Sequence, residues 1–180
     1  MPYAADLSQT ESHNTEDAVF SLDFYEPYAL AVQNVFLLCC ALRDNARKSG
    51  EDPGVRMLTY RLKTPESISG KLISRGLPVS RQAAGSVLRD VSGLRVVLES
   101  TQQVYRFAQQ LVASPVVELS QIKDYIRAPK PSGYQSLHVI LRVPVCLRRE
   151  QYLIPVEVQL RTAGMDRWAS AEHDLVYKPK

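Results

Sequence analysis

Apolar and polar residues alternate along residues 134–143, and this period of two predicts a β-strand. One face of the predicted strand is apolar, running from Leu137 through Val139 and Leu141 to Val143. The opposite face carries Tyr134, Ser136, His138, Ile140 and Arg142. The apolar face is expected to pack on a core, which leaves the other face to solvent or to a functional site.

A second alternating run, residues 155–161, predicts another strand, whose polar face carries Glu157, Gln159 and Arg161. The segment between the two runs, residues 146–151, is short enough to be a hairpin loop. Antiparallel pairing of the strands would join their polar faces into one surface. An ordinary solvated strand face is an equally good interpretation of this pattern by itself.

Helical periodicity marks the longest predicted helix, residues 23–47, which ends at the turn-forming residues 49–54. Thr64 is a suitable N-cap and Pro65 a suitable first residue for a helix that runs to about Arg75. Further helices are predicted at residues 80–88, 101–113 and 162–177. The last of them is expected to bury Met165, Trp168 and Ala169.

Shorter apolar runs predict strands at residues 94–98 and 116–119, and a loop follows at residues 123–133. The fold class is therefore α+β, with a mixed sheet of about five strands and helices packed against it. Residues 1–22 have little to bury and are expected to form a disordered tail. Residues 23–180 are expected to form a single domain, because 45% of the 180 residues are hydrophobic.

A net charge of +3 suits an anionic small-molecule ligand and is too small to imply RNA or DNA as a partner. The three cysteines form no CxxC pair, which favours reduced thiols and a cytoplasmic protein. No signal-peptide pattern is seen, and the most apolar stretch, residues 28–42, is too short to cross a bilayer, so no membrane association is expected. The three histidines lack metal-ligand spacing, so zinc is not expected.

Polar residues able to bind or react are spread over several predicted elements, and most of them are cationic. Cations can hold phosphate oxygens while one or two carboxylates hold Mg²⁺, so the set predicts a nucleotide-phosphate site. Neither a P-loop nor a GxGxxG motif is present to carry it. The candidates are Arg61, Lys63, Ser67, Lys71, Asp90, Arg95, Lys123, Lys130, Tyr134, Ser136, His138, Glu157, Gln159 and Arg161.

Five segments in order resemble the motifs of the RelA/SpoT synthetase domain, and the size resembles that of a stand-alone small alarmone synthetase. They read RLKTPESI, DVSGLRVV, KDYIRAPKPSGYQSLH, EVQLRT and MDRWASAEHDLVYK. The resemblance implies a nucleotidyltransferase-like fold and a Mg²⁺-dependent GTP pyrophosphokinase of the stringent response. Such an enzyme moves the β,γ-pyrophosphate of ATP to the 3′-hydroxyl of GDP or GTP, which gives ppGpp or pppGpp and AMP. Hydrolysis of the product is not expected.

The resemblance also assigns residues to ATP and to the metal. Arg61 and Arg95 match the two arginines that stack on adenine, and the ATP phosphates fall to Lys63, Ser67 and Lys71. Without the resemblance, Ser67 and Lys71 would be read as part of an ordinary solvated helix. The catalytic and metal-binding pair is Asp90 and Glu157, with Glu157 either a second ligand or the general base.

On the acceptor side, Tyr134 matches the residue that stacks on guanine, and Asp166 falls where the family contacts the guanine edge. The whole group matched to GDP or GTP is Lys123, Lys130, Tyr134, His138, Gln159 and Asp166. Glu172 and His173 are interpreted as bracing the strand face, without a chemical role.

Two other functions fit the same sequence. One is a toxin-like relative that pyrophosphorylates ATP or the tRNA 3′ end. The other is an inactive nucleotide- or RNA-binding regulator, which the paired carboxylates Asp90 and Glu157 disfavour. A homo-oligomer is an expectation that the sequence leaves open. Stand-alone members usually continue beyond the last motif into helices that help to build a tetramer.

Overall fold

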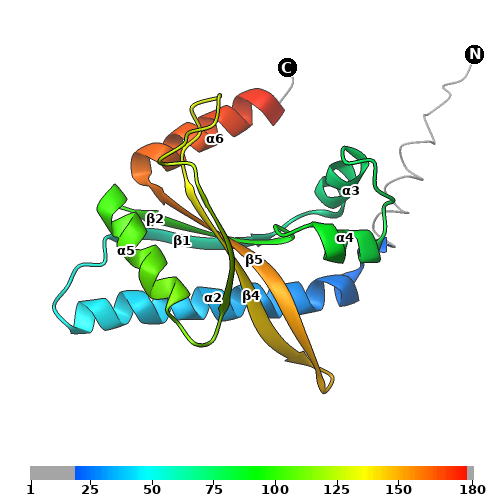
Figure 1. Ribbon diagram of the computed structural model, residues 1–180, viewed down its shortest axis with the longest axis horizontal. Helices are drawn as coiled ribbons and strands as arrows, with labels where there is room; N and C mark the ends of the chain where they lie inside the picture. Colours follow the sequence, from blue (N-terminus) through cyan, green and yellow to red (C-terminus); the bar gives the residue numbers. More distant parts are fainter. Residues whose placement is uncertain (1–18, 178–180) are drawn as a thin grey trace, which may run out of the picture.

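A computed structural model of the chain describes residues 19–177, with side chains described as far as Glu172. A five-stranded sheet forms its centre, in the order β1-β2-β5-β4-β3. The strands are β1 (Val55–Leu62), β2 (Ser92–Leu98), β3 (Glu118–Asp124), β4 (Leu137–Leu147) and β5 (Glu150–Thr162). The helices, labelled in Figure 1, are α2 (Leu22–Lys48), α3 (Pro65–Ile73), α4 (Arg81–Val87), α5 (Thr101–Val112) and α6 (Ala163–Tyr177).

The sheet is mixed, which confirms the predicted α+β class and the mixed sheet of about five strands. β2 pairs with β5 in parallel, whereas the β1–β2, β3–β4 and β4–β5 pairs are antiparallel. The last strand in the chain, β5, therefore lies in the middle of the sheet. This order brings the polar face of β5 between residues from β2 on one side and from β4 on the other.

The β4–β5 hairpin joins the two polar faces, as predicted. His138 lies opposite Gln159, and Ile140 lies opposite Glu157. Pairing continues to the hairpin tip, where Arg148 and Arg149 form the turn with φ angles of 52° and 71°. The predicted loop at residues 146–151 is thus too long, because both turn residues adopt the left-handed backbone of a two-residue turn without the usual glycine.

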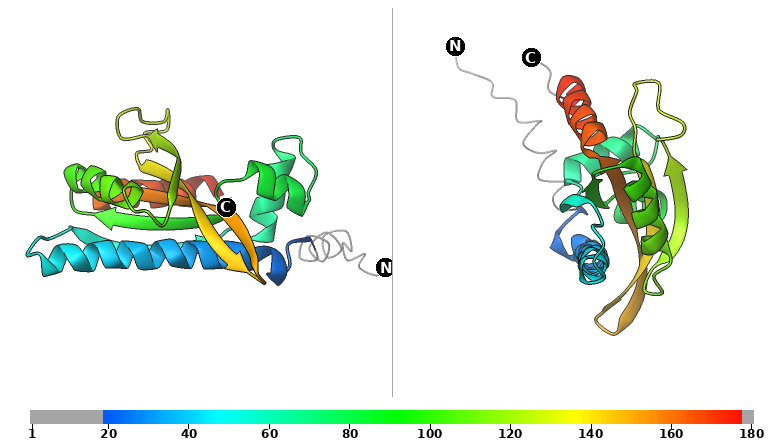
Figure 2. Two further views of the ribbon diagram at one scale, coloured as in Figure 1. Left: turned by 60° about the horizontal axis from the view of Figure 1, so that its bottom comes forward. Right: turned by 90° about the vertical axis from the view of Figure 1, so that its left-hand side faces the viewer.

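The core lies between the sheet and α2, which runs along the sheet below it in the left view of Figure 2. Ala31, Val32 and Val35 of α2 are fully buried in this core. On the sheet side, Val156 and Val158 of β5 pack against them, and α5 closes the same core.

By length and composition α2 could cross a membrane. The predicted apolar stretch, residues 28–42, therefore underestimated the length of the apolar helix. Its buried face gives the apolar character another explanation, since a core helix passes the same test.

Local sequence signals place the helix ends. The Thr64 side chain accepts a hydrogen bond from the backbone N–H of Ser67 at the start of α3, and Ser80 caps α4 in the same way. Ser100 and Gln103 form a capping box at the start of α5. Gly76 follows α3 with a φ of 67°, a conformation that favours glycine after a helix.

Predictions failed at the sheet edges. The sequence analysis assigned no strand to β1, and it placed β3 at residues 116–119, whereas β3 spans Glu118–Asp124. Both strands are mainly exposed, so neither has a continuous buried face that produces alternation. Trp168 is also not in the core as predicted, because it is 43% exposed and only Ala169 of its predicted group is buried.

Residues 1–18 of the predicted tail lie outside the described residues, so the tail stays a prediction. Phe20, near its end, is 2% exposed and belongs to the core. Phe20 packs against Phe24 with ring centroids 5.0 Å apart. The packed part of the chain therefore begins slightly before the predicted boundary at residue 23.

Candidate active site

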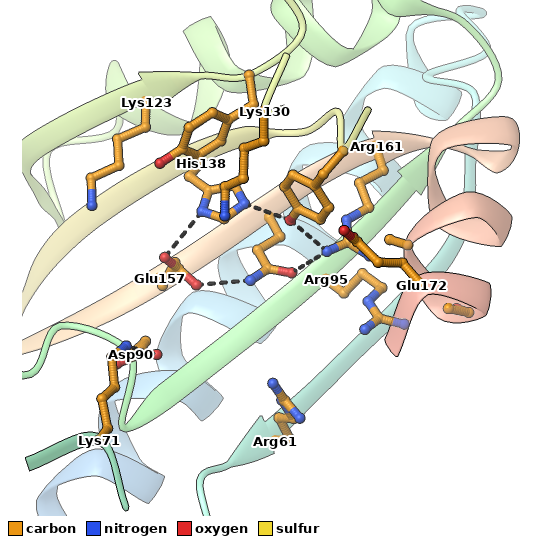
Figure 3. Close-up of a pocket in the computed structure, with 15 residues that line it drawn as sticks. Arg61, Lys71, Asp90, Arg95, Lys123, Lys130, His138, Glu157, Arg161 and Glu172 are labelled. Carbon is orange, nitrogen blue, oxygen red and sulfur yellow. Dashed lines mark hydrogen bonds and ion pairs between the residues drawn. The ribbon is translucent and has the colours of Figure 1, made fainter. Parts of the chain in front are cut away.

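A cavity of about 720 Å³ opens on the face of the sheet that carries Glu157 and Gln159 (Figure 3). β1, β2, β4 and β5 supply its floor, and α6 and the loop between β3 and β4 supply its walls. The residues that line it are Arg61, Lys71, Asp90, Arg95, Lys123, Tyr125, Lys130, Tyr134, His138, Glu157, Gln159, Arg161, Ala169, Ser170 and Glu172. A volume of this size is typical of small-molecule sites.

Cations outnumber carboxylates in the cavity wall. Arginine and lysine contribute six side chains to it, and aspartate and glutamate contribute three. A smaller cavity of about 200 Å³ continues along β1 and β2, and it shares Arg61, Arg95, Asp90 and Glu157 with the first. The surplus of positive charge suits a ligand that carries several phosphate groups.

Asp90 lies just before β2 and is held by two lysines. Its Oδ2 lies 2.6 Å from Nζ of Lys71 on α3 and 3.0 Å from Nζ of Lys63, which follows β1. Burial raises the pKa of the Asp90 carboxyl, but the two ammonium groups lower it more, so the pKa lies below its ordinary value. Oδ1 is buried and has no hydrogen-bond partner among the described residues. One oxygen of this carboxylate is thus left to accept another ligand.

Arg61 and Arg95 lie on neighbouring strands and point the same way. Arg61 is opposite Gly93 and Thr59 is opposite Arg95, so the two guanidinium groups are diagonal neighbours on one face of the sheet. Gly93 has no side chain to fill the space between them. Burial and the nearby charge of Arg161 lower the pKa of Arg95 from its ordinary value, yet an arginine stays charged.

Glu157 lies in the middle of β5 and accepts hydrogen bonds from an imidazole and from an amide. Nδ1 of His138 lies 3.1 Å from its Oε1, and Nε2 of Gln159 donates to Oε2 over 2.8 Å. Burial raises the pKa of Glu157, but these hydrogen bonds, with that from His138 the larger, lower it more, so the pKa lies below its ordinary value. Glu157 is therefore an ionised carboxylate at neutral pH.

The loop between β3 and β4 folds over the cavity through two tyrosines and a lysine. Nζ of Lys130 lies 4.8 Å from the ring centre of Tyr134 and 4.9 Å from that of Tyr125. Gly133, with a φ of 84°, turns the chain here, and a side chain at that position would meet the Trp168 ring of α6 at 3.3 Å. The loop and α6 thus form one wall.

Most residues predicted for the site lie together in the cavity. Lys63 reaches it through Asp90, and Asp166 lies beside it, with Oδ1 3.1 Å from Nη1 of Arg161 and 3.4 Å from Nη1 of Arg95. Ser67 is exposed at the start of α3 and does not line the cavity. The structure therefore groups the predicted residues by position, and their roles stay predictions.

Residues 60–180 match the family model described as "Region found in RelA / SpoT proteins". The chain belongs to the RelA/SpoT family. The resemblance of the five sequence motifs is thereby confirmed for two thirds of the chain, from β1 to the C-terminal end.

Two proteins of Bacillus subtilis (strain 168) are similar to this RelA/SpoT-family chain. GTP pyrophosphokinase YwaC is 36% identical over 118 residues, which are 66% of this chain and 56% of YwaC. GTP pyrophosphokinase YjbM is 27% identical over 155 residues, which are 86% of this chain and 72% of YjbM. The chain thus spans little more than half the length of YwaC.

Solved structures of the family share the fold. A GTP pyrophosphokinase family protein from Streptococcus pneumoniae superposes with a TM-score of 0.81 at 32% identity, over 86% of this chain and 75% of that protein. The small alarmone synthetase 1 from Bacillus subtilis bound to its product pppGpp superposes with a TM-score of 0.79 at 26% identity, over 86% of this chain and 78% of the other. The mixed sheet and its flanking helices are thus a shared framework.

Some cavity residues of the RelA/SpoT-family chain received no chemical role from the sequence. Tyr125 packs edge-on against His138, with centroids 5.2 Å apart, and Glu172 lines the cavity from α6, where a bracing role alone was expected. Arg161 was a candidate by its place on the polar strand face, but no role was assigned to it. Strand alternation was the signal for Arg161, whereas nothing in the loop pattern marked Tyr125.

Proposed function

We propose that this protein is a GTP pyrophosphokinase that transfers the β,γ-pyrophosphate of ATP to the 3′-hydroxyl of GDP or GTP, in the stringent response. Its relatives YwaC and YjbM carry that activity in their names, and one structural relative holds the product pppGpp. The observation that carries the proposal is a cavity with two carboxylates in different surroundings, Asp90 between two lysines and Glu157 between a histidine and a glutamine.

The ATP half of the cavity comprises Arg61, Arg95, Lys63, Lys71 and Asp90. Adenine would lie between the guanidinium groups of Arg61 and Arg95, over the flat surface left by Gly93. The ammonium groups of Lys63 and Lys71, which contact Asp90, would then bind phosphate oxygens. Ser67, in the first turn of α3, would add a hydroxyl to the phosphate-binding group, although it does not line the cavity.

The acceptor half comprises the loop between β3 and β4 and the polar face of the hairpin. Tyr134 offers an aromatic ring to guanine, and Lys123, Lys130 and His138 surround the position of the acceptor phosphates. Asp166 would accept hydrogen bonds from N1 and N2 of guanine, which adenine cannot donate in that pattern. Gln159 joins this half through its contact with Glu157.

The reaction needs a base because a ribose hydroxyl is a poor nucleophile at pH 7. Glu157, ionised and aimed into the cavity, takes the proton as the 3′-oxygen attacks the β-phosphorus of ATP. The bond between that phosphorus and the α,β-bridging oxygen breaks, and AMP leaves with the bridging oxygen. The cationic side chains around the phosphates stabilise the charge that moves onto AMP.

The residues present fit Mg²⁺, because Asp90 has a buried oxygen without a partner and Glu157 supplies a second carboxylate in the same cavity. Asp90 and Glu157 are the side chains that would hold the ion. Within the described residues no group of three or more His, Cys, Asp or Glu could bind a metal alone, so phosphate oxygens and water would complete the coordination. Bound Mg²⁺ would neutralise phosphate charge and align the pyrophosphate.

Product analysis tests the function directly. The protein is incubated with labelled ATP, Mg²⁺ and, separately, GMP, GDP, GTP, ATP or deacylated tRNA. AMP released in equal amount to a new 3′-pyrophosphorylated guanine nucleotide is the expected result. Label on tRNA or on ATP without a guanine product would assign the protein to the toxin-like relatives instead. Nucleotide binding without any transfer would make it a regulator.

We also propose a cytoplasmic location, because the cysteines are free. Burial chiefly raises the pKa of the Cys39 thiol to about 12, so that thiol is unreactive.

A homo-oligomer is a further expectation, which light scattering of the purified protein checks. RNA is permitted by the positive charge but not implied by it, and tRNA binding that falls steeply with salt would establish it.

A further inference from the structure

Arg161 is the most deeply buried cation of the cavity, and it contacts three of the side chains around it. The residue is 4% exposed. Its Nη2 donates to Oη of Tyr134 and to Oε1 of Gln159, each over 2.7 Å, and its Nη1 donates to Oδ1 of Asp166 over 3.1 Å. Nε is buried and has no partner among the described residues. Removing the guanidinium would therefore release several groups at once.

Two chains of hydrogen bonds lead from Arg161 and meet at Glu157 (Figure 3). The first passes through Tyr134 to His138, whose Nε2 lies 2.8 Å from the tyrosine Oη, and from Nδ1 of His138 to Oε1 of Glu157. The second passes through Gln159 to Oε2 of Glu157. Together the five side chains close a ring across β4, β5 and the loop before β4.

The chemistry of the two ends fixes the direction of the hydrogen bonds made there. An arginine only donates and an ionised carboxylate only accepts. Tyr134 thus accepts from Arg161, and its own hydrogen is free to point at Nε2 of His138. The imidazole carries a hydrogen on Nδ1, facing Glu157, because the carboxylate can only accept. Gln159 must likewise turn its oxygen to Arg161 and its NH₂ to Glu157.

We propose that Arg161 is a positioning residue, which orders both hydrogen-bond chains so that they hold the Glu157 carboxylate in one orientation toward the acceptor hydroxyl. This inference rests on the proposed function, because that function gives Glu157 its role. Asp166 secures the far side of the guanidinium, with Arg95 as its second partner. Arg161 acts through Tyr134, His138 and Gln159, so its loss misplaces Glu157 without removing it.

The first test is the ring hydrogen of His138, observed by ¹⁵N NMR of the protein alone and assigned with His138→Gln. The expected wild-type spectrum shows an Nδ1–H signal that its hydrogen bond to Glu157 shifts downfield and protects from exchange with water. In Arg161→Met both chains lose their anchor, so this signal should move upfield and exchange faster. A wild-type ring without that signal, or an unchanged signal in Arg161→Met, would overturn the proposal.

The second test is kinetic, with Mg²⁺, ATP and GDP. Arg161→Met should lower kcat by about 10- to 100-fold, as loss of an orienting partner typically does, with the KM for ATP within about twofold. Arg161→Lys, which keeps a donor and the charge, should recover part of kcat. The matched control is Arg142→Met, an exposed arginine of β4 that pairs with Glu118, and it should behave as wild type. A change in KM alone would contradict positioning.

Combined variants decide whether the effect passes through the chains. Tyr134→Phe opens the first chain and Gln159→Met the second, and adding Arg161→Met to both should lower kcat no further. A further tenfold loss would give Arg161 another role. Should Arg161→Met fail to fold, Tyr134→Phe alone must still move the Nδ1–H signal of His138, because it opens the first chain, or the proposal fails. Since the NMR result needs no substrate, it separates failure of this proposal from failure of the proposed function.

Discussion

Asp90 and Glu157, two carboxylates of the cavity, are held in different ways. Asp90 is paired with two lysines that come from other parts of the chain, Lys63 after β1 and Lys71 on α3. Glu157 accepts hydrogen bonds from His138 and Gln159, which lie beside it on β4 and β5. Two ammonium groups hold the first carboxylate, and an imidazole and an amide hold the second.

This difference shows which half of the cavity can exchange partners. A lysine that pairs with Asp90 can turn to a phosphate oxygen, because an ammonium group binds either anion without a fixed geometry. The donors to Glu157 lie on paired strands and belong to a closed ring, so they keep their partners. The Asp90 half is suited to receive a charged ligand, and the Glu157 half is suited to hold one group still.

The largest expected effect comes from Glu157→Gln, which keeps the size of the side chain and removes its charge. Without a proton acceptor, kcat should fall by about 10²- to 10⁴-fold, while ATP binding is largely kept. AMP release and a separate ATP-binding titration measure the two effects. Glu150→Gln, the same change on the exposed hairpin end, is the control. Turnover near the wild-type rate in Glu157→Gln would remove Glu157 from the mechanism.

Lys71→Met tests the exchangeable half. Loss of a charge-assisted contact to phosphate should weaken ATP binding by about 1.5–3 kcal/mol, with little change for GDP. Isothermal titration with each nucleotide gives both numbers, and Lys48→Met at the exposed end of α2 serves as the control. Equal weakening of ATP and GDP would show that Lys71 does not distinguish the two halves.

Tyr134 has two expected roles, since it is predicted to stack on guanine and it also belongs to the hydrogen-bonded ring. Tyr134→Ala should weaken the guanine acceptor by about 1–3 kcal/mol if the ring stacks, with little effect on ATP. Tyr134→Phe keeps the aromatic face and should leave acceptor binding intact. Measured dissociation constants for GDP in the two variants separate the roles, and a loss of affinity in Tyr134→Phe equal to that in Tyr134→Ala would argue against stacking.

The smallest effect concerns stability against pH. The Asp90 pKa lies below its ordinary value in the fold, so its contribution to the free energy of unfolding is present above about pH 4 and is lost as pH falls further. Asp90→Asn should cost about 1–3 kcal/mol at pH 7, because it leaves Lys63 and Lys71 without their partner. The cost should shrink toward pH 2. Urea unfolding at several pH values measures it, and a cost that does not change with pH would contradict the ion-pair account.

The strands that the sequence predicted best are those with one buried face. In β4, Leu141 and Val143 flank Arg142, and in β5, Val158 lies between Glu157 and Gln159, because the core requires an apolar side chain at every second position. β1 and β3 lie at the edges of the sheet and are mostly exposed, so their sequences satisfy hydrogen bonding without alternation. Tertiary pairing, which no local pattern records, places them.

The prediction of the site shows the same contrast between local sequence pattern and tertiary structure. Strand alternation and motif resemblance pointed to Asp90 and Glu157, and the fold brings both to one cavity. The direction of a hydrogen bond depends on atoms that meet only in three dimensions, so the ring through Arg161 could not be read from the chain. Trp168 shows the opposite error, because its spacing on α6 suggested burial while its ring covers Gly133 from an exposed position.

The sheet order has a consequence for how the protein is made. Ser92 at the start of β2 donates a buried hydrogen bond to the backbone carbonyl of Pro155, 63 positions later in the chain. β5 must insert between β2 and β4 before Asp90, Arg95 and Glu157 can share a cavity. Such long-range parallel pairing is slow compared with local helix formation. During synthesis the ribosome must therefore release almost all of the described chain before any nucleotide can find a complete site, and catalysis begins only with a finished fold.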